Sequence, residues 1–154
     1  MVRMADLPEA ERDMLMKFDC PSFETQPWVS GPPLNQRRIA LVTTAGLHGR
    51  NDRPFQMNQP DFYRVIPGDA QANDLVMSHL APSFDRSGYQ RDWNVLFPLD
   101  RLREMKDEGI IGSLAEFHYS FGTPLSVEET EMAAKEIADL CKKDHVNAVL
   151  LFPV

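Results

Sequence analysis

The stretch SVEETEMAAKEIADLCKKDHVNAVLLF, residues 126–152, decides the fold. Its first part repeats apolar residues at every third or fourth position, which predicts an amphipathic helix. Ser126 and Glu129 have the spacing of a capping box, so the helix should begin there. After a turn at Asp144-His145, the run Val146 to Phe152 is apolar on both faces, which predicts an interior parallel strand. A helix, a tight turn and a buried strand form the second half of a right-handed crossover unit.

Further apolar runs upstream predict the other strands of the same sheet. The expected strands are Arg38–Thr44, Tyr63–Ile66, Asp74–His79 and Leu114–Phe121, with a helix over about Leu99–Glu108. Helices that alternate with short apolar strands are typical of a mainly parallel sheet covered by helices. The expected fold class is therefore α/β, a three-layer Rossmann-like or flavodoxin-like fold with a mainly parallel sheet.

The N-terminal quarter of the chain differs from the rest. A short helix is expected over about Pro8–Phe18, and the segment Cys20–Gln36 is rich in proline, which favours an extended arm. We therefore expect two parts: residues 1–37 as an N-terminal helix and arm, and residues 38–154 as one α/β domain.

Composition excludes several classes of protein. The chain has 154 residues, 43% of them hydrophobic, which suffices for a core of its own. Its 16 basic and 23 acidic residues give a formal net charge of −7, which argues against binding to nucleic acid or to an anionic membrane. No apolar run approaches the roughly 20 residues of a membrane span, and the acidic N-terminus does not resemble a signal peptide. The expected location is the cytoplasm.

Three of the four histidines follow or end a predicted strand. His48, His79 and His118 should therefore meet at one edge of the sheet, with Val154 at the same edge. Histidine exchanges protons near neutral pH and is the most common metal ligand, although a structural hydrogen bond is the ordinary role at a strand end. His145 lies in the turn at the opposite edge, where we expect a solvated cap.

Other candidates for chemistry are weak. Three histidines and a water can hold catalytic zinc, but no local pair of ligands supports such a site, and none is expected. Asp85 and Asp92 lie in a polar loop, where charges are usually solvated. Cys141 should be packed against the core and Cys20 lies far from the histidines, so neither is placed as a nucleophile. From its residues alone, the chain is an α/β domain with a histidine-lined edge and no nucleophile.

Six segments, in this order, resemble a known family. They are Arg38–His48 with Pro54-Phe55, Tyr63–Asp69, Asp74–His79, Arg91–Glu104, Gly109–Ser113 and Val146–Val154. The series resembles the selenoprotein B family of glycine, sarcosine, betaine and D-proline reductases, most closely its D-proline-reductase-like branch. The resemblance covers about residues 38–154, and the N-terminal helix and arm lie outside it.

The resemblance implies where the nucleophile belongs. In this family the strand that matches Val146–Phe152 leads directly into the catalytic selenocysteine, or a cysteine in its place, with a further cysteine a few residues later. We therefore expect the nucleophile just after Val154, at a UGA codon that ordinary gene calling reads as a stop. On this interpretation the chain is the N-terminal part of a reductase, incomplete at its C-terminus and inactive alone.

The resemblance also implies the chemistry, which is reductive cleavage of the C–N bond of a small amino acid or related amine. A selenolate attacks the carbon that bears nitrogen, and a thiol and then a thioredoxin-like dithiol donor regenerate it. In the amino-acid reductases a pyruvoyl group on a partner subunit activates the substrate amine. His48, His79 and His118 would then steady the selenolate or protonate the leaving nitrogen, and Asp85 and Asp92 would receive the cationic amine.

Two alternatives remain open, as does formation of homo-oligomers. The chain could be a non-catalytic relative that serves as a binding or partner module, or a histidine-dependent metalloenzyme on the same sheet. The codons after Val154 separate the first alternative from the reductase, and metal analysis tests the second.

Overall fold

The computed structural model describes residues 3–17, 22, 24, 26, 28–56, 62–80, 84–122 and 127–154. The chain divides into two compact units, Met1–Ser30 and Gly31–Val154. The first unit contains η1 (Met4–Asp6) and α1 (Glu9–Leu15), and the described residues after them have no regular structure. Ser126, the expected helix cap, and Cys20 lie outside the described residues.

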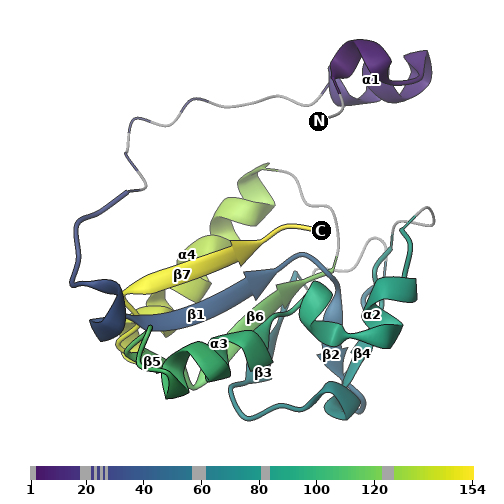
Figure 1. The fold of residues 1–154 in the computed structure, drawn as a ribbon. Coiled ribbons are helices and arrows are strands. Elements are labelled where there is room, and N and C mark those ends of the chain that lie inside the picture. The colour runs from purple at the N-terminus through teal and green to yellow at the C-terminus, as the bar shows by residue number, and fades with distance from the viewer. Residues whose placement is uncertain are drawn as a thin grey trace. The chain divides into compact units, whose positions relative to one another are not determined.

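The second unit is built on a five-stranded mixed sheet with β1 (Arg38–Thr43) at its centre (Figure 1). β5 (Ser113–Leu114) and β6 (Phe117–Phe121) run parallel to β1 along one of its edges, and β7 (Ala148–Phe152) runs parallel to it along the other. β3 (Tyr63–Pro67) pairs antiparallel with β6 and closes that side. The α/β class with mostly parallel strands is confirmed.

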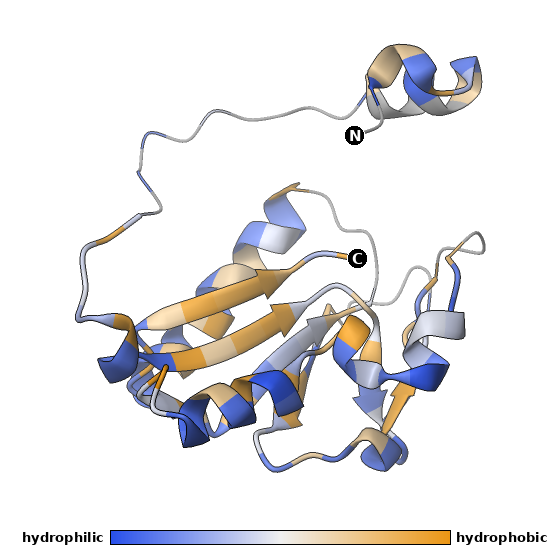
Figure 2. Ribbon diagram, viewed as in Figure 1, coloured by the Kyte–Doolittle hydropathy of each residue, from blue (hydrophilic) through white to orange (hydrophobic). Residues whose placement is uncertain are grey.

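Helices cover both faces of the sheet. α3 (Leu99–Asp107) packs on one face and α4 (Val127–Lys143) on the other. Side chains of β1 alternate between the two cores: Ile39 and Leu41 join the α3 side, and Ala40 joins the α4 side. Figure 2 shows that β1 and β7 are mainly hydrophobic and that the helices beside the sheet mix hydrophilic and hydrophobic residues.

A small ribbon stands apart from the main sheet. β2 (Leu47–Gly49) and β4 (Leu75–Met77) pair antiparallel with each other, and η3 (Ala72–Asp74) leads into β4. The expectation that the 74–79 strand joins the main sheet is therefore wrong. The turn at Gly46, with a φ of 68°, redirects the chain after β1 so that β2 leaves the sheet.

The segment before α3 is more ordered than its polar composition suggests. It forms α2 (Ser87–Arg91) and η4 (Trp93–Val95). Buried Trp93 donates from Nε1 to Asp100 on α3 at 2.6 Å. Arg103 on α3 donates to the carbonyl oxygens of Gly68 and Ala70, at 2.9 and 2.8 Å, and so fixes the helix against the turn after β3.

Two strand predictions need correction. The single strand expected over residues 114–121 is broken into β5 and β6. β7 pairs with β1, but no described segment pairs with its outer side, and Leu151 remains 69% exposed. β7 is therefore an edge strand and not the interior strand expected.

The turn before β7 lies at the other end of that strand from Val154, as expected. Exposed His145 adopts a φ of 56° and donates its N–H to Lys142 at 3.1 Å. Beside it, Asp144 forms an ion pair with Arg38 and accepts the Glu116 N–H at 2.6 Å. These contacts join the amino ends of β1 and β7 to the break between β5 and β6.

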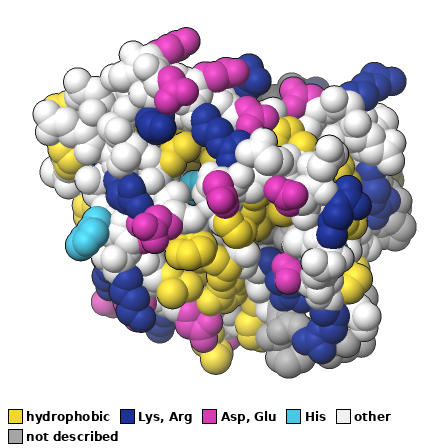
Figure 3. All heavy atoms as spheres, turned by 90° about the horizontal axis from the view of Figure 1, so that it is seen from below, with side chains coloured by type: hydrophobic (Ala, Val, Ile, Leu, Met, Phe, Trp, Pro, Cys, Tyr) yellow, Lys and Arg dark blue, Asp and Glu magenta, His cyan; other side chains and the backbone are white. Residues whose placement is uncertain are grey.

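Acidic and basic side chains mix on the face seen in Figure 3, where they surround a strip of hydrophobic atoms. The described helices include none with the length and apolar character needed to cross a membrane.

Candidate functional site

The order of the strands identifies the edge where a ligand would bind. From β1 the chain passes by α3 to β6 on one side, and α4 then carries it across β1 to β7 on the other side. In open α/β sheets, ligands bind outside the carboxyl ends of the strands where this direction reverses. In this chain that point lies at the carboxyl ends of β1 and β7, beside Thr44 and Val154 (Figure 1).

Thr44 holds the segment that leaves β7. Its Oγ1 accepts the Val154 N–H at 2.8 Å and lies 3.3 Å from the Val154 carbonyl oxygen, to which the hydroxyl donates. The Thr44 N–H also points to the Phe152 carbonyl, at 3.4 Å. Pro153 has no N–H, so the regular pairing ends at Phe152 and the threonine side chain takes over.

Gly46 brings the ribbon to the same edge. Its N–H donates to the Phe121 carbonyl at the end of β6, and its carbonyl accepts the Ser78 N–H, both at 2.8 Å. A Cβ added at Gly46 would lie 2.9 Å from the His79 nitrogen, so only glycine fits this approach. Val154 and Ser78 are therefore hydrogen-bonded to the short turn that follows β1, and the backbone of His79 lies against it.

Within this edge, His48 and Ser78 form a hydrogen-bonded pair. His48 is 2% exposed, and its Nδ1 lies 2.7 Å from the Gly49 carbonyl oxygen, which can only accept. Nδ1 therefore carries the proton, and Nε2 accepts the Ser78 hydroxyl at 2.7 Å. An imidazole oriented in this way, with Nε2 against a hydroxyl, can exchange a proton through that hydroxyl.

His79 lies next in the chain, two residues after β4 ends. Its ring stacks on Phe84 with centroids 4.5 Å apart, and its carbonyl accepts a hydrogen bond from Arg86 at 2.7 Å. Of the three predicted histidines, His48 is thus hydrogen-bonded to Ser78, and His79 is the next residue along the chain from that serine.

His118 does not belong to this group, which corrects the prediction of a shared edge. It is the second residue of β6 and is fully buried within the sheet. Its Nδ1 accepts the Leu41 N–H at 3.1 Å. The reason is the break between β5 and β6: β1 has no backbone acceptor there, and the imidazole supplies one.

Asp85 and Asp92 each accept hydrogen bonds from a residue two positions later. Asp85 bonds to Ser87 through the backbone N–H at 2.8 Å and the hydroxyl at 3.0 Å, and Asp92 bonds to the N–H and amide of Asn94. These bonds lower the pKa of both carboxyls. The two side chains stay ionised and close local turns.

The described residues hold neither a metal cluster nor a reactive thiol. No three histidine, cysteine, aspartate or glutamate side chains among them gather closely enough to bind a metal ion, so the three histidines do not form a zinc site. Cys141 is buried on α4, and burial raises the pKa of its thiol. It packs with Tyr119 and Ile137, as expected for an inert core cysteine.

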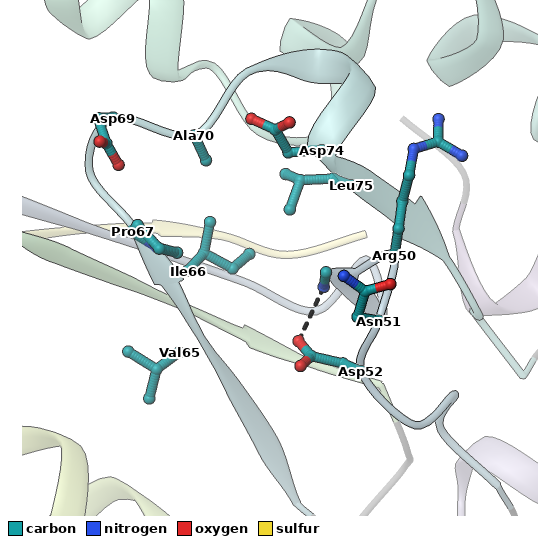
Figure 4. Close-up of a pocket in the computed structure, with 11 residues that line it drawn as sticks. Arg50, Asn51, Asp52, Val65, Ile66, Pro67, Asp69, Ala70, Asp74 and Leu75 are labelled. Atoms are coloured by element: carbon teal, nitrogen blue, oxygen red, sulfur yellow. Dashed lines mark hydrogen bonds between the residues drawn. The ribbon is translucent and has the colours of Figure 1, made fainter.

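A separate hollow of about 510 Å³ lies between the ribbon and β3 (Figure 4). The side chains of Arg50, Asp52, Asp69 and Asp74 line it. Asp52 accepts the Gly49 N–H and Asp74 accepts the Gln71 N–H, at 2.9 and 2.8 Å, so both carboxylates are engaged in local turns. At its far end Pro67 pairs with Phe117, the first residue of β6, which places that end away from the carboxyl edge.

The fold defines an α/β protein, and its candidate ligand site is the edge at the carboxyl ends of the parallel strands. The family model for glycine/sarcosine/betaine reductase selenoprotein B matches residues 20–153, so the chain belongs to that family. The family resemblance found in the sequence is thereby confirmed, but its expected extent is wrong, because the match also includes the proline-rich arm from residue 20 onward.

Individual relatives agree with this assignment. The chain is 38% identical over 120 residues to a D-proline reductase subunit gamma of Acetoanaerobium sticklandii, which covers 77% of this chain and 49% of the relative. It is 30% identical over 146 residues to a glycine reductase complex component B subunit gamma of Symbiobacterium thermophilum, which covers 88% of this chain and 33% of that relative. A betaine reductase complex component B subunit beta of Peptoclostridium acidaminophilum is 32% identical over 123 residues, which covers 77% of this chain and 28% of that relative.

The chain thus spans half or less of the length of these relatives. No solved structure matches it significantly.

Sequence reasoning missed Thr44 and Ser78. Both lie at or next to the last residue of a predicted strand, and a hydroxyl residue at the end of a strand that leads to the ligand edge could have drawn attention to them. Their importance depends on partners that are distant in the sequence, 110 residues away for Thr44 and 30 for Ser78.

Proposed function

We propose that this chain is the N-terminal part of a selenol- or thiol-dependent reductase that cleaves a C–N bond of a small amino acid or related amine. Residues 38–154 supply the reductase-like domain, and residues 1–37 precede it as a helix and arm. The nucleophile, selenocysteine or cysteine, follows Val154. Family membership and the names of the relatives support the reaction class.

The position of Val154 carries the proposal. Thr44 holds its backbone at the carboxyl edge, where the strand order reverses, and a residue that follows would emerge into the crevice where α/β proteins bind ligands. A nucleophile at that point is presented to substrate from the end of a strand that β1 holds along one side.

The reaction needs two proton transfers at this edge. The selenolate attacks the carbon that bears nitrogen, the C–N bond breaks, and the nitrogen leaves with the electron pair and takes a proton. A thiolate then attacks selenium, the carbon leaves with the C–Se electron pair and takes a second proton, and a dithiol reduces the Se–S bond. We assign proton transfer to His48 through the Ser78 hydroxyl, with His79 beside it. Asp85 and Asp92 both remain candidates to receive the substrate amine, since both carboxylates are ionised and, among the described residues, each is hydrogen-bonded only to the residue two positions later. The buried position of His118 disfavours a catalytic role for that residue.

Partner subunits supply what this chain lacks. The relatives are named as components of reductase complexes, which supports a partner reductase subunit. We propose that the partner carries a pyruvoyl group that activates the amine, that a thioredoxin-like dithiol is the electron donor, and that the complex works in the cytoplasm on a small-molecule substrate.

The test is the activity of the polypeptide that continues past Val154, assayed with its partner subunit. We expect dithiol-dependent cleavage of D-proline, glycine or betaine that is abolished when the nucleophile is replaced by serine. Ser78→Ala should lower kcat without a matching rise in KM, because the proton relay is lost while binding is not. Turnover that survives replacement of the nucleophile, or absence of turnover with every substrate, would refute the proposal.

A further inference from the structure

β7 has the apolar composition of an interior strand, but several of its side chains are exposed to solvent. Val149, Leu150 and Leu151 are 46%, 37% and 69% exposed, although all three are apolar. Edge strands that face water are usually protected by charges, proline or bulges. β3, at the opposite edge of the sheet, carries Arg64 and Pro67, whereas β7 carries neither a charge nor a proline (Figure 2).

The exposure is uneven between the two faces. Val149 and Leu151 pair with Ala40 and Val42, whose side chains belong to the α4 side of the sheet. Ala148 and Phe152, on the other face, are partly buried against the α3-side core. The buried residues of α4 pack over β1 and β6, so α4 leaves the Val149–Leu151 pair uncovered.

The topology indicates which kind of element would cover Val149 and Leu151. The crossover from β6 to β7 places α4 on one face of the sheet, and parallel crossovers are right-handed in nearly all proteins. A further crossover that continues outward in the same direction would put its helix on that same face, and its strand along the outer side of β7. This is the face on which Val149 and Leu151 are most exposed.

We propose that β7 is the docking edge for one further strand–helix unit, the crossover that continues the polypeptide after β7 in the longer members of the family. That segment adds a parallel strand to the free side of β7 and lays an apolar helix face over Val149 and Leu151. The relatives, of which the chain covers at most 49%, have the length to contain it. This inference rests on exposure and topology and is independent of the nucleophile.

A structure of the intact D-proline reductase subunit gamma of Acetoanaerobium sticklandii tests the occupant. We expect the strand matched to β7 to lie inside the sheet, with a parallel strand outside it and a helix on the α4 face. A matched strand that is at the edge, or that is covered by a second copy or another subunit, would overturn the proposal.

The exposed pair can be tested in the 154-residue chain itself. Val149→Lys combined with Leu151→Lys should reduce binding of an apolar fluorescent dye at least twofold and leave the melting temperature nearly unchanged. Val65→Lys on β3, which is 43% exposed, is the matched control and should have little effect on dye binding. Dye binding that the double variant leaves intact would contradict an exposed docking edge. A stable dimer that the double variant dissociates would identify a second copy as the occupant, against the proposal.

Discussion

At the scale of single residues, His118 has a structural role in the sheet. Its Nδ1 accepts the Leu41 N–H, so its Nε2 carries the ring proton, and that atom is buried with no hydrogen-bond partner in the part of the chain that the structure describes. Burial, helped by the charges of Arg103 and Arg38, lowers the pKa of His118 to about 4. The imidazole is therefore neutral in the folded protein at neutral pH.

This shift predicts a loss of stability in mild acid. The unfolded chain protonates His118 near pH 6.5, whereas the folded chain does so only near pH 4. Stability contributed by this group should fall as the pH drops from about 6.5 to 4, by about 3 kcal/mol in all, and should change little below that. The measurement is urea unfolding at several pH values.

His118→Asn isolates the effect, because the amide oxygen can still accept the Leu41 N–H but does not titrate. In the variant, the free energy of unfolding should lose most of its dependence on pH between pH 6.5 and 4. An unchanged pH profile would show that another group causes the acid sensitivity.

Alanine substitutions at Gly46 and Gly109 separate the stability cost of steric overlap from the cost of backbone strain. The φ angles of the two glycines are 68° and 72°, but an added Cβ meets the His79 backbone at Gly46 and meets nothing within 4 Å at Gly109. Gly109→Ala should cost about 1–2 kcal/mol from strain alone, and Gly46→Ala about 2–5 kcal/mol from strain and overpacking together. Chemical denaturation measures both, and equal losses would contradict the close approach of the ribbon to β1.

At the scale of elements, Thr44 should decide how firmly the end of β7 is held. Thr44→Val keeps the shape of the side chain and removes both bonds to Val154, so we expect residue 154 to become mobile and the protein to lose about 0.5–1.5 kcal/mol. Thr44→Ser keeps the hydroxyl and is the control. Backbone ¹⁵N relaxation measures the mobility, and equally rigid ends in both variants would show that Thr44 does not position this segment.

Most elements could be predicted from the sequence because periodicity is local. The apolar face of α4 and the aliphatic run of β1 each specify an element without reference to the rest of the chain. Pairing partners are set by distant contacts, which is why residues 74–79 were placed in the wrong sheet and the break before β6 was missed. The apolar run of β7 did indicate a strand, but composition alone does not distinguish an interior strand from one whose outer side is unpaired in the described part of the chain.

The candidate site was predictable only in part, for the same reason. Strand ends pointed to His48 and His79, which do lie with Ser78 around the turn at Gly46. The same argument failed for His118, because its position within β6 depends on where the strand breaks. Thr44 and Ser78 could not be found because side-chain partners across 110 and 30 residues leave no local pattern.

At the scale of the whole molecule, the 154-residue chain should have no reductase activity by itself. Cys141 is buried with a raised pKa, and we infer that Cys20 lies far in sequence from the residues of the candidate site. Assays with D-proline or glycine and a dithiol should show no turnover above the uncatalysed rate. Turnover that disappears in Cys20→Ser or Cys141→Ser would contradict this and would identify a nucleophile within the chain.

The central claim is that a nucleophile follows β7 at the carboxyl edge. The nucleotide sequence after the codon of Val154 tests it most directly. We predict an in-frame UGA, or a cysteine codon in its place, followed by further coding sequence with a cysteine codon a few positions later. A UAA or UAG stop at that point, or a continuing reading frame that encodes neither selenocysteine nor cysteine there, would contradict the account.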